Sequence, residues 1–428
     1  MKILIKNGRV IDPSQGIDKK TDVLVEKGKI AKTGNCAADK ETKVIDAAGK
    51  IVCPGFIDMH THLREPGRED KETVETGLRA AVAGGFTTVC AMPNTEPACD
   101  TQSQALFLRE KAAKLGTGTV IPVGAITKKR EGKAISQMSE LKDAGCLLVS
   151  DDGSGVQDAA VMRRAMEYAA MLGLVVSVHC EEKTLAENGV MNEGYWSTVL
   201  GLNGIPREAE NIMIDRDIKL AELTKAKLHI AHVSTKEGVE MVRAAKKKGI
   251  AVTAEATPHH FTLTDEEVKT YNTNLKVNPP LRTKDDVEAV KKGLKDGTID
   301  VIATDHAPHL ESEKEREFDF APFGMIGLET ALALACTELV DDGYLTMKEL
   351  IQKLAENPAK ILGYEKGTLK EGAAADITIF DPEKKWVYEK NKIRSRSANS
   401  PFIGRELKGK VTDVIVDGKI VMKEEELV

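Results

Sequence analysis

The chain has 428 residues, of which 41% are hydrophobic and 30% are charged, a composition that is ordinary for a soluble globular protein. At this length we expect one large domain and one smaller one. The formal net charge of -6 indicates neither nucleic acid nor a membrane surface as a partner. The seven cysteines form no CxxC pair, and no apolar run approaches the roughly 20 residues of a membrane span. We therefore expect a cytoplasmic protein without a disulfide framework.

Both ends of the chain carry short β-patterned runs, separated by turn signals such as Asn7-Gly8 and Asp417-Gly418. Two similar ends around a different middle predict one small β-sandwich domain built from residues 1–53 plus 366–428. The runs are Ile3–Ile5, Asp22–Val25, Lys43–Ile45, Ile51–Cys53, Asp376–Phe380, Trp386–Tyr388 and Val411–Val416.

The middle of the chain, residues 54–365, alternates short apolar runs with helix-like stretches. Near-continuous apolar strands between helices are typical of a parallel sheet buried on both faces. Eight such runs predict a (β/α)8 TIM-like barrel; a doubly wound open sheet is the alternative, but no Gly-rich phosphate loop follows any run. The runs are Gly55–Met59, Thr87–Met92, Thr119–Ile126, Cys146–Val149, Leu174–Val178, Leu228–Val233, Ala251–Ala256 and Asp300–Ala303.

All nine histidines fall in or just after these predicted strands, and in such a barrel the chemistry lies at the carboxyl ends of the strands. Side chains alternate faces along a strand, so His60 and His62 share a face. By the same parity His232 faces the pore, and His229 is expected to be a packed histidine facing the helices. One aspartate of the pair Asp151 and Asp152 can also face the pore.

The side chains expected at the pore mouth are imidazoles and carboxylates, which are ligands that zinc accepts. Six ligands exceed what one tetrahedral ion needs, so two ions that share a bridging carboxylate are expected. The alternative is a set of buried histidines bonded to the backbone, which would not concentrate at strand ends in this way. The six are His60, His62, His179, His232, Asp305 and one aspartate of the pair 151–152. Cys90, Cys146 and Cys180 are interpreted as small core residues.

Two motifs carry a resemblance to a known family. Gly55–Gly67 (GFIDMHTHLREPG) resembles the opening metal motif of the dihydroorotases, within the amidohydrolase superfamily, and Ile302–His309 (IATDHAPH) resembles their closing motif. The matching segments in between follow the family's order, so the resemblance runs essentially from end to end. They are Met92–Thr95, Asp151–Gly153, His179–Glu181, His232–Thr235 and Asn278–Leu281.

The resemblance implies a role for each matching residue. His60 and His62 would hold one Zn²⁺ ion with Asp305, while His179 and His232 hold a second, and Asp152 would bridge the two. Many relatives bridge with a modified lysine, but residues 146–152 contain none, which resembles an aspartate-bridged branch. Asp305 would be the catalytic proton shuttle. The residues implied to bind substrate are His62, Arg64, Asn94, Asn278, His309, Phe323 and Gly324.

The implied reaction is the reversible cyclisation of N-carbamoyl-L-aspartate to L-dihydroorotate in pyrimidine synthesis. Two alternatives remain open: a dihydropyrimidinase, hydantoinase or allantoinase, and a catalytically silent scaffold that binds a transcarbamoylase. The first would leave Arg64 without a carboxylate to bind, and the second should have lost ligands. We also expect a homodimer, with association with aspartate transcarbamoylase as a further option. The charge run Glu311–Glu317 is interpreted as a solvated loop, with an active-site lid over residues 310–322 as the alternative.

Overall fold

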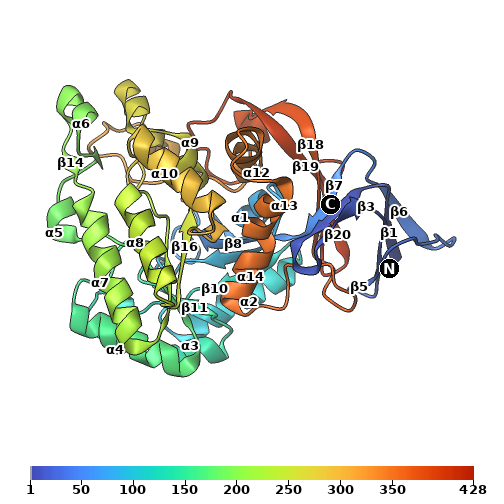
Figure 1. Ribbon diagram of the computed structural model, residues 1–428, viewed down its shortest axis with the longest axis horizontal. Helices are drawn as coiled ribbons and strands as arrows, with labels where there is room; N and C mark the ends of the chain where they lie inside the picture. The colour runs from blue at the N-terminus through green and yellow to red at the C-terminus, as the bar shows by residue number, and fades with distance from the viewer. Residues whose placement is uncertain (1) are drawn as a thin grey trace.

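The computed structural model describes residues 2–428, so Met1, the first residue of the expected composite domain, lies outside the described residues. The strands of the two chain ends lie side by side at one end of the molecule (Figure 1), while the helices and parallel strands of the middle segment make up the rest. Strands from the two ends of the chain therefore lie together in space, and β18 pairs with β7.

Each of the apolar runs in the middle segment contains a parallel strand, which confirms the predicted alternation. The strands form two sheets, in the orders β10-β9-β8 and β11-β12-β15-β16-β17. Single parallel bridges join Gly124 to Val149 and Thr61 to His306, and so connect the edges of the two sheets. The strands are β8 (Phe56–Thr61), β9 (Phe86–Ala91), β10 (Thr119–Pro122), β11 (Leu148–Val149), β12 (Val175–Val178), β15 (Lys227–Ile230), β16 (Val252–Ala256) and β17 (Val301–Ile302).

Helices follow these strands and cover the sheets, and capping residues define where the helices begin and end. In α4, the Asp158 carboxylate accepts hydrogen bonds from the amides of Ala160 and Val161, and Gly173 closes the helix with a φ of 72°. Within residues 2–428, no helix combines the length and apolar character needed to cross a bilayer. The principal helices are α1 (Val74–Ala83), α2 (Gln102–Leu115), α3 (Met138–Asp143), α4 (Ala159–Leu172), α7 (Glu208–Thr224), α8 (Lys236–Lys247), α10 (Lys284–Lys295), α12 (Ala331–Ala335), α13 (Met347–Ile351) and α14 (Asn357–Leu362).

Short elements decorate the loops between these strands and helices. They are α5 (Lys183–Ala186), β13 (Met191–Asn192), α6 (Tyr195–Leu200), β14 (Gly204–Ile205), α9 (Pro258–Thr262) and α11 (Glu311–Lys314). The first four follow β12, and the last two follow β16 and β17.

The chain ends form two further sheets, in the orders β21-β20-β19-β18-β7-β2-β3 and β5-β4-β1-β6. Side chains of both sheets meet in one buried cluster, in which Ile3 and Val23 of one sheet lie with Val52 and Ile377 of the other. The runs expected at 376–380 and 386–388 are a single bulged strand, β18. The strands are β1 (Lys2–Lys6), β2 (Arg9–Asp12), β3 (Ile17–Lys20), β4 (Val23–Glu26), β5 (Lys29–Thr33), β6 (Thr42–Asp46), β7 (Ile51–Pro54), β18 (Ile377–Val387), β19 (Glu406–Val416), β20 (Lys419–Lys423) and β21 (Glu426–Leu427).

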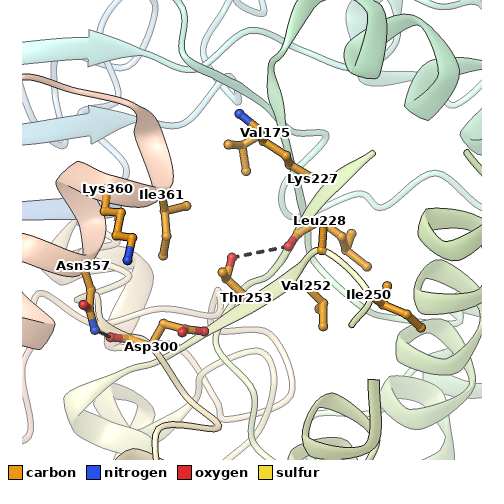
Figure 2. A pocket seen from close by; sticks show the side chains of 11 residues that line it. Val175, Lys227, Leu228, Ile250, Val252, Thr253, Asp300, Asn357, Lys360 and Ile361 are labelled. Carbon is orange, nitrogen blue, oxygen red and sulfur yellow. Dashed lines mark hydrogen bonds between the residues drawn. The ribbon is translucent and has the colours of Figure 1, made fainter. Parts of the chain in front are cut away.

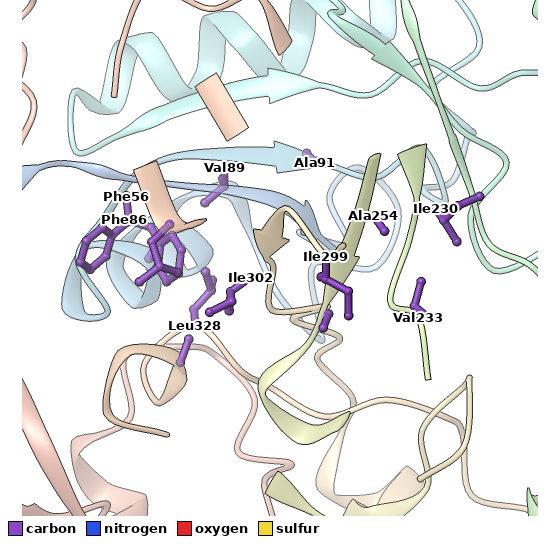
Figure 3. Packing of buried hydrophobic residues seen from close by; sticks show 14 of the residues in the cluster. Phe56, Phe86, Val89, Ala91, Ile230, Val233, Ala254, Ile299, Ile302 and Leu328 are labelled. Carbon is purple, nitrogen blue, oxygen red and sulfur yellow. The ribbon is translucent and has the colours of Figure 1, made fainter. Parts of the chain in front are cut away.

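Phe56, at the start of β8, joins the parallel strands to the terminal sheet. Its ring centroid lies 5.7 Å from that of Phe86 and 6.3 Å from that of Phe380, and Figure 3 shows Phe56 and Phe86 in the buried cluster that reaches Leu328. Aromatic pairs at these separations stabilise a core beyond the area they bury. Phe56 therefore contributes to the packing between the two parts of the chain.

Asp58 ties the first parallel strand to the segment after the last one. Its carboxylate accepts hydrogen bonds from the hydroxyl of Thr304 at 2.5 Å, the amide of Thr304 at 3.1 Å and the amide of His60 at 3.0 Å. Burial raises the pKa of Asp58 to about 7 despite these hydrogen bonds. The two segments that carry His60 and Asp305 are thus held together directly beneath those residues.

We expect Phe56→Ala to destabilise the protein by about 3–5 kcal/mol, because it removes a fully buried ring and leaves a cavity. Urea unfolding followed by circular dichroism should show an earlier midpoint for this variant. The matched control is Phe320→Ala, since Phe320 is 62% exposed and its loss should change stability by less than about 0.5 kcal/mol. Equal midpoints for the two variants would contradict the role given to Phe56.

Candidate active site

The residues expected at the pore mouth come together at the carboxyl ends of the parallel strands. His60 lies on β8, and the others lie one to three residues beyond the ends of their strands. All are at least nine-tenths buried. They are His60, His62, Asp152, His179, His232 and Asp305. The carboxyl ends of the strands and the turns that follow them thus bring these six side chains to one place.

Asp152 lies among four imidazoles. Its Oδ1 is 3.3 Å from His60 Nε2, 3.6 Å from His232 Nε2 and 3.7 Å from His179 Nδ1, and its Oδ2 is 3.5 Å from His62 Nε2. Burial acts to raise the pKa of Asp152, but the surrounding imidazoles outweigh it and hold that pKa well below its usual range. The carboxylate therefore stays ionised in a buried place.

Asp305 makes a second cluster beside the first. Its Oδ1 lies 2.9 Å from His62 Nε2 and 3.6 Å from His60 Nε2. Potential ligand atoms thus gather in two overlapping groups, His60 with Asp152 and His232, and His60 with His62 and Asp305, each with its ligand atoms within 4.8 Å of one another. Both groups have the nitrogen and oxygen donors that divalent zinc accepts.

Unsatisfied polar atoms mark the same place. Among residues 2–428, His60 Nε2 and Asp152 Oδ1 are buried polar atoms that make no hydrogen bond, and such atoms are costly unless something else binds them. In two of the ligand rings the other nitrogen is engaged: His60 Nδ1 lies 2.7 Å from Glu255 and His62 Nδ1 lies 2.8 Å from the side-chain oxygen of Asn94. If each Nδ1 donates to its oxygen, both Nε2 lone pairs face the centre. The donor set therefore fits divalent cations.

Three site residues adopt the left-handed backbone region that side chains rarely occupy: Arg64 (φ 61°), His232 (φ 34°) and Asp305 (φ 46°). Such conformations are strained and concentrate at functional sites. In His232 the turn has a direct consequence, because strand β15 ends at Ile230 and the ring reaches the centre through this turn rather than by strand alternation.

The expectation that His229 packs toward the helices is wrong. Its ring is fully buried, as expected, but Nε2 lies 3.0 Å from Glu255 and Nδ1 lies 2.8 Å from the Thr253 hydroxyl. Ile230 instead joins the cluster that includes helix side chains. The parity argument failed because it extended regular strand geometry to His232, across the irregular turn.

A cavity of about 200 Å³ opens above the clustered ligands. It is smaller than the pockets that bind drug-sized ligands, so it suits a small molecule. All the residues implied to bind substrate line it, whereas His60 lies behind its wall. The lining residues named by the sequence are His62, Arg64, Asn94, Asp152, His179, His232, Asn278, Asp305, His309, Phe323 and Gly324.

One side of the cavity is basic. Arg64 donates from Nε to the carbonyl oxygen of Pro308 at 3.1 Å, and its Nη2 lies 3.2 Å from His309 Nε2. Burial lowers the pKa of Arg64 to about 10, so the guanidinium stays charged at neutral pH. Burial and then the charge of Arg64 lower the pKa of His309, which keeps that imidazole neutral. The charged guanidinium of Arg64 therefore makes this corner of the cavity suitable for binding an anion.

Asn278 and the Phe323-Gly324 backbone contribute further hydrogen-bonding groups to the cavity wall. Asn278 donates to Glu181 at 2.8 Å, and Glu181 lies 3.8 Å from His179 Nε2. Gly324 has a φ of 127°, and a Cβ built there would lie 2.7 Å from the Cβ of Ala307. Only glycine therefore lets the Phe323-Gly324 backbone approach the cavity this closely.

Two site-forming residues escape the sequence analysis. Glu255, on β16, bonds to the rings of both His60 and His229. The feature of the sequence that could have indicated its role is a single acidic residue within an apolar strand. Asn399 lies far along the chain; its side-chain oxygen accepts from the amide of His309 at 3.0 Å, and its nitrogen donates to the carbonyl of Gly324 at 3.2 Å. No local pattern points to a contact over that separation.

The charge run at 311–317 is only partly the solvated loop expected. Glu311 and Glu315 are exposed, but Lys314 is buried and donates to the carbonyl oxygens of Thr273 at 2.9 Å and Pro322 at 2.7 Å. Burial lowers the pKa of Lys314 to about 7. Hydrogen bonds from Lys314 therefore attach the middle of this segment to the rest of the protein.

A second cavity, of about 360 Å³, lies at the opposite end of the strands. Figure 2 shows Val175, Leu228 and Val252, near the amino ends of β12, β15 and β16, around it. Catalysis in parallel barrels takes place at the carboxyl ends of the strands. The smaller cavity, beside the histidines, is therefore the candidate active site.

Comparison with solved structures finds proteins of similar fold. The fold is similar to that of the L-hydantoinase (dihydropyrimidinase) from Arthrobacter aurescens, with a TM-score of 0.89 and 27% identity over 100% of this chain and 97% of that one. It is also similar to the dihydropyrimidinase from Brevibacillus agri, with a TM-score of 0.87, 25% identity, and coverage of 100% and 96%. The fold and the site define a cyclic amidohydrolase.

Comparison with protein sequences identifies the family within the cyclic amidohydrolases. A family described as "Dihydro-orotase-like" matches residues 49–238. The chain is 53% identical to a dihydroorotase from Pelotomaculum thermopropionicum, over 99% of each chain, and 51% identical to one from Syntrophus aciditrophicus, over 99% of this chain and 100% of that one. The chain belongs to the dihydroorotase family.

Asp152→Asn should lower metal content and activity by more than about 100-fold, because substitutions one shell further from a metal already cost 10–100-fold. Asp151→Asn is the matched control, since the Asp151 carboxylate is occupied by the amide of Thr127 at 3.0 Å and by the Thr127 hydroxyl. Elemental analysis and turnover of both purified variants would decide. Equal losses would mean that the wrong aspartate has been placed at the centre.

Proposed function

We propose that this chain interconverts N-carbamoyl-L-aspartate and L-dihydroorotate, with loss or gain of water, in pyrimidine synthesis. The observation that carries the proposal is one small cavity with clustered metal-type ligands on its floor and an anion-binding corner in its wall. The identity of about half the residues with dihydroorotases over the full length supports it.

Two Zn²⁺ ions are proposed at the floor, one held by His60, His62 and Asp305 and one by His179 and His232, with Asp152 between them. Bound ions of this kind acidify a water and polarise the carbonyl of a cyclic amide. The orphaned nitrogen of His60 and oxygen of Asp152 support the assignment.

The substrate carboxylate is proposed to lie in the basic corner. A guanidinium offers a planar fork that matches a carboxylate, so Arg64 would bind it in two places. Asn94 and His309, which border the same cavity, would complete the contact. Asn278 and the Phe323-Gly324 backbone, which line the same cavity, would contact the ring and orient its amide over the floor.

Asp305 is proposed to move the proton. Its carboxylate lies at the floor, 2.9 Å from His62 Nε2, and the imidazoles of His62 and His60 lower its pKa against the effect of burial. An ionised carboxylate there can take a proton from the attacking water and hand it to the leaving ring nitrogen. In ring closure the same group returns the proton.

A hydantoinase activity is the second candidate, because the similar solved structures carry that name. Hydantoin and dihydrouracil lack the carboxylate that the basic corner would bind, and the partly buried guanidinium of Arg64 would then have no anionic group of the substrate to pair with. The absence of lysine from residues 146–152 also departs from lysine-bridged relatives. Both points favour dihydroorotate.

The proposal extends to the organisation of the protein. Residues 54–365 would form a closed (β/α)8 barrel, which the bridges Gly124–Val149 and Thr61–His306 support. Residues 1–53 plus 366–428 would form a composite β-sandwich, which the shared buried cluster of the two terminal sheets supports. A cytoplasmic homodimer and association with aspartate transcarbamoylase are further parts of the proposal, implied by the family resemblance.

The direct test is an assay of the purified chain with L-dihydroorotate, N-carbamoyl-L-aspartate, dihydrouracil and hydantoin. We expect turnover of the first two, loss of that turnover after chelation of metal, and its return on addition of Zn²⁺. Preference for dihydrouracil or hydantoin would support the hydantoinase candidate instead. Metal binding without turnover of any of the four would support a silent scaffold.

Arg64→Met should cripple turnover of dihydroorotate and leave metal content unchanged. Loss of one partner from a charge-assisted pair typically costs about 2–5 kcal/mol, which corresponds to a roughly 30- to several-thousand-fold fall in kcat/KM. Arg68→Met is the control, because Arg68 pairs with exposed Asp70 outside the cavity. Parallel loss of activity on dihydroorotate and on uncharged dihydrouracil, at full metal loading, would contradict a role in binding the carboxylate.

A further inference from the structure

We propose that Glu255 and His229 are positioning residues that hold the rings of the metal ligands in place from below. The inference rests on the proposed function, since it concerns the ligands His60 and His232. Neither Glu255 nor His229 lines the substrate cavity. Both act through another residue rather than on the substrate.

Glu255 accepts from three donors on two other strand segments. Its Oε1 lies 2.7 Å from His60 Nδ1 and 3.3 Å from the backbone nitrogen of His232, and its Oε2 lies 3.0 Å from His229 Nε2. The carboxylate is 1% exposed. One side chain on β16 thus contacts a ligand on β8 and the backbone of a ligand after β15.

The contact with His60 selects the ring nitrogen that faces the centre. A neutral imidazole carries one proton, so donation from Nδ1 to Glu255 leaves Nε2 with a free lone pair. That Nε2 is 3.3 Å from Asp152 and belongs to both groups of candidate ligands. Carboxylates that accept from the far nitrogen of a ligand histidine fix its tautomer and raise its basicity.

The contact with His232 stabilises a strained turn. The backbone of His232 has a φ of 34°, which an L-residue adopts only when its surroundings impose it. The amide that points at Glu255 belongs to this same residue. Glu255 therefore holds the turn that brings the His232 ring to the centre.

His229 fixes Glu255 in turn. Its Nε2 donates to the carboxylate oxygen that His60 does not use, and its Nδ1 lies 2.8 Å from the Thr253 hydroxyl. The Thr253 hydroxyl lies 3.3 Å from the carbonyl oxygen of Leu228, and both residues line the second cavity, at the amino ends of the strands (Figure 2). The chain of contacts thus runs from the partly buried Thr253, on the amino-terminal side of the strands, through the buried His229 and Glu255 to the ligands.

Zinc affinity is the measurement that tests this inference, determined on the full-length chain by competition with a chromophoric chelator. Glu255→Leu removes the acceptor and should weaken zinc binding by about 10- to 100-fold. His229→Leu removes one donor and should weaken it less, whereas His229→Gln restores an amide donor near Glu255 and should recover most of the affinity. At saturating zinc, His229→Leu should regain the wild-type KM for dihydroorotate.

The control is His260→Gln. His260 is also a buried histidine with both ring nitrogens bonded, to the Thr257 hydroxyl at 2.8 Å and the Pro279 carbonyl at 2.9 Å, but it does not contact Glu255. Its zinc affinity should match that of the wild type. Thermal melts in the presence of chelator check that each variant folds without metal. If Glu255→Leu does not fold, the comparison of His229→Leu with His229→Gln tests the inference instead.

Wild-type zinc affinity in folded Glu255→Leu, or equal affinities for His229→Leu and His229→Gln, would overturn the inference. Equal weakening by His260→Gln would overturn it as well, because any buried histidine would then have the same effect. Failure of the wild-type chain to bind zinc or to turn over dihydroorotate would instead overturn the proposed function. The two failures are therefore distinguishable.

Discussion

The structure depends on keeping several charged groups buried in one place. Asp152, Asp305 and Glu255 all lie at the rim of the parallel strands, at most 7% exposed. A buried carboxylate is tolerated only when donors or cations compensate it. The imidazoles that surround these three carboxylates come from β8 and from the ends of β12 and β15. The carboxyl ends of these strands must therefore lie level with one another along the strand direction. Convergence of strand ends thus places the chemistry and also constrains the fold.

Segments distant in sequence complete the site around this centre. Asp58 joins β8 to Thr304, just before the proposed proton carrier. Asn399 reaches back from the C-terminal part of the chain to the backbones of His309 and Gly324. Polar side chains that bond to several backbone groups at once are well suited to hold irregular segments. The terminal part of the chain therefore helps to shape the cavity.

Fold similarity and sequence similarity answer different questions here. The hydantoinase-type structures share the scaffold at 25–27% identity, whereas the relatives at 51–53% are dihydroorotases. One scaffold supports several activities, and the side chains of the site separate them. In this chain the proposed separating feature is Arg64, because an uncharged cyclic ureide would offer its guanidinium no carboxylate to bind.

The sequence by itself determined the alternation of strands and helices and the set of side chains at the strand ends. Apolar runs and helix-like stretches predict the eight parallel strands of the two main sheets, since both depend on local hydrophobic periodicity, whereas the short parallel pair of β13 and β14 was not predicted. The motifs around His60 and Asp305 also predict which residues gather at the centre.

Tertiary structure alone decided the inward direction of His229 and the bonds that Glu255 and Asn399 make. Strand parity predicts direction only while the strand stays regular, and β15 ends two residues before His232, whose backbone turns to a φ of 34°. Hydrogen bonds such as that from His309 to Asn399 join residues that are distant in the chain. Such contacts depend on how the whole chain packs, and no local pattern records that.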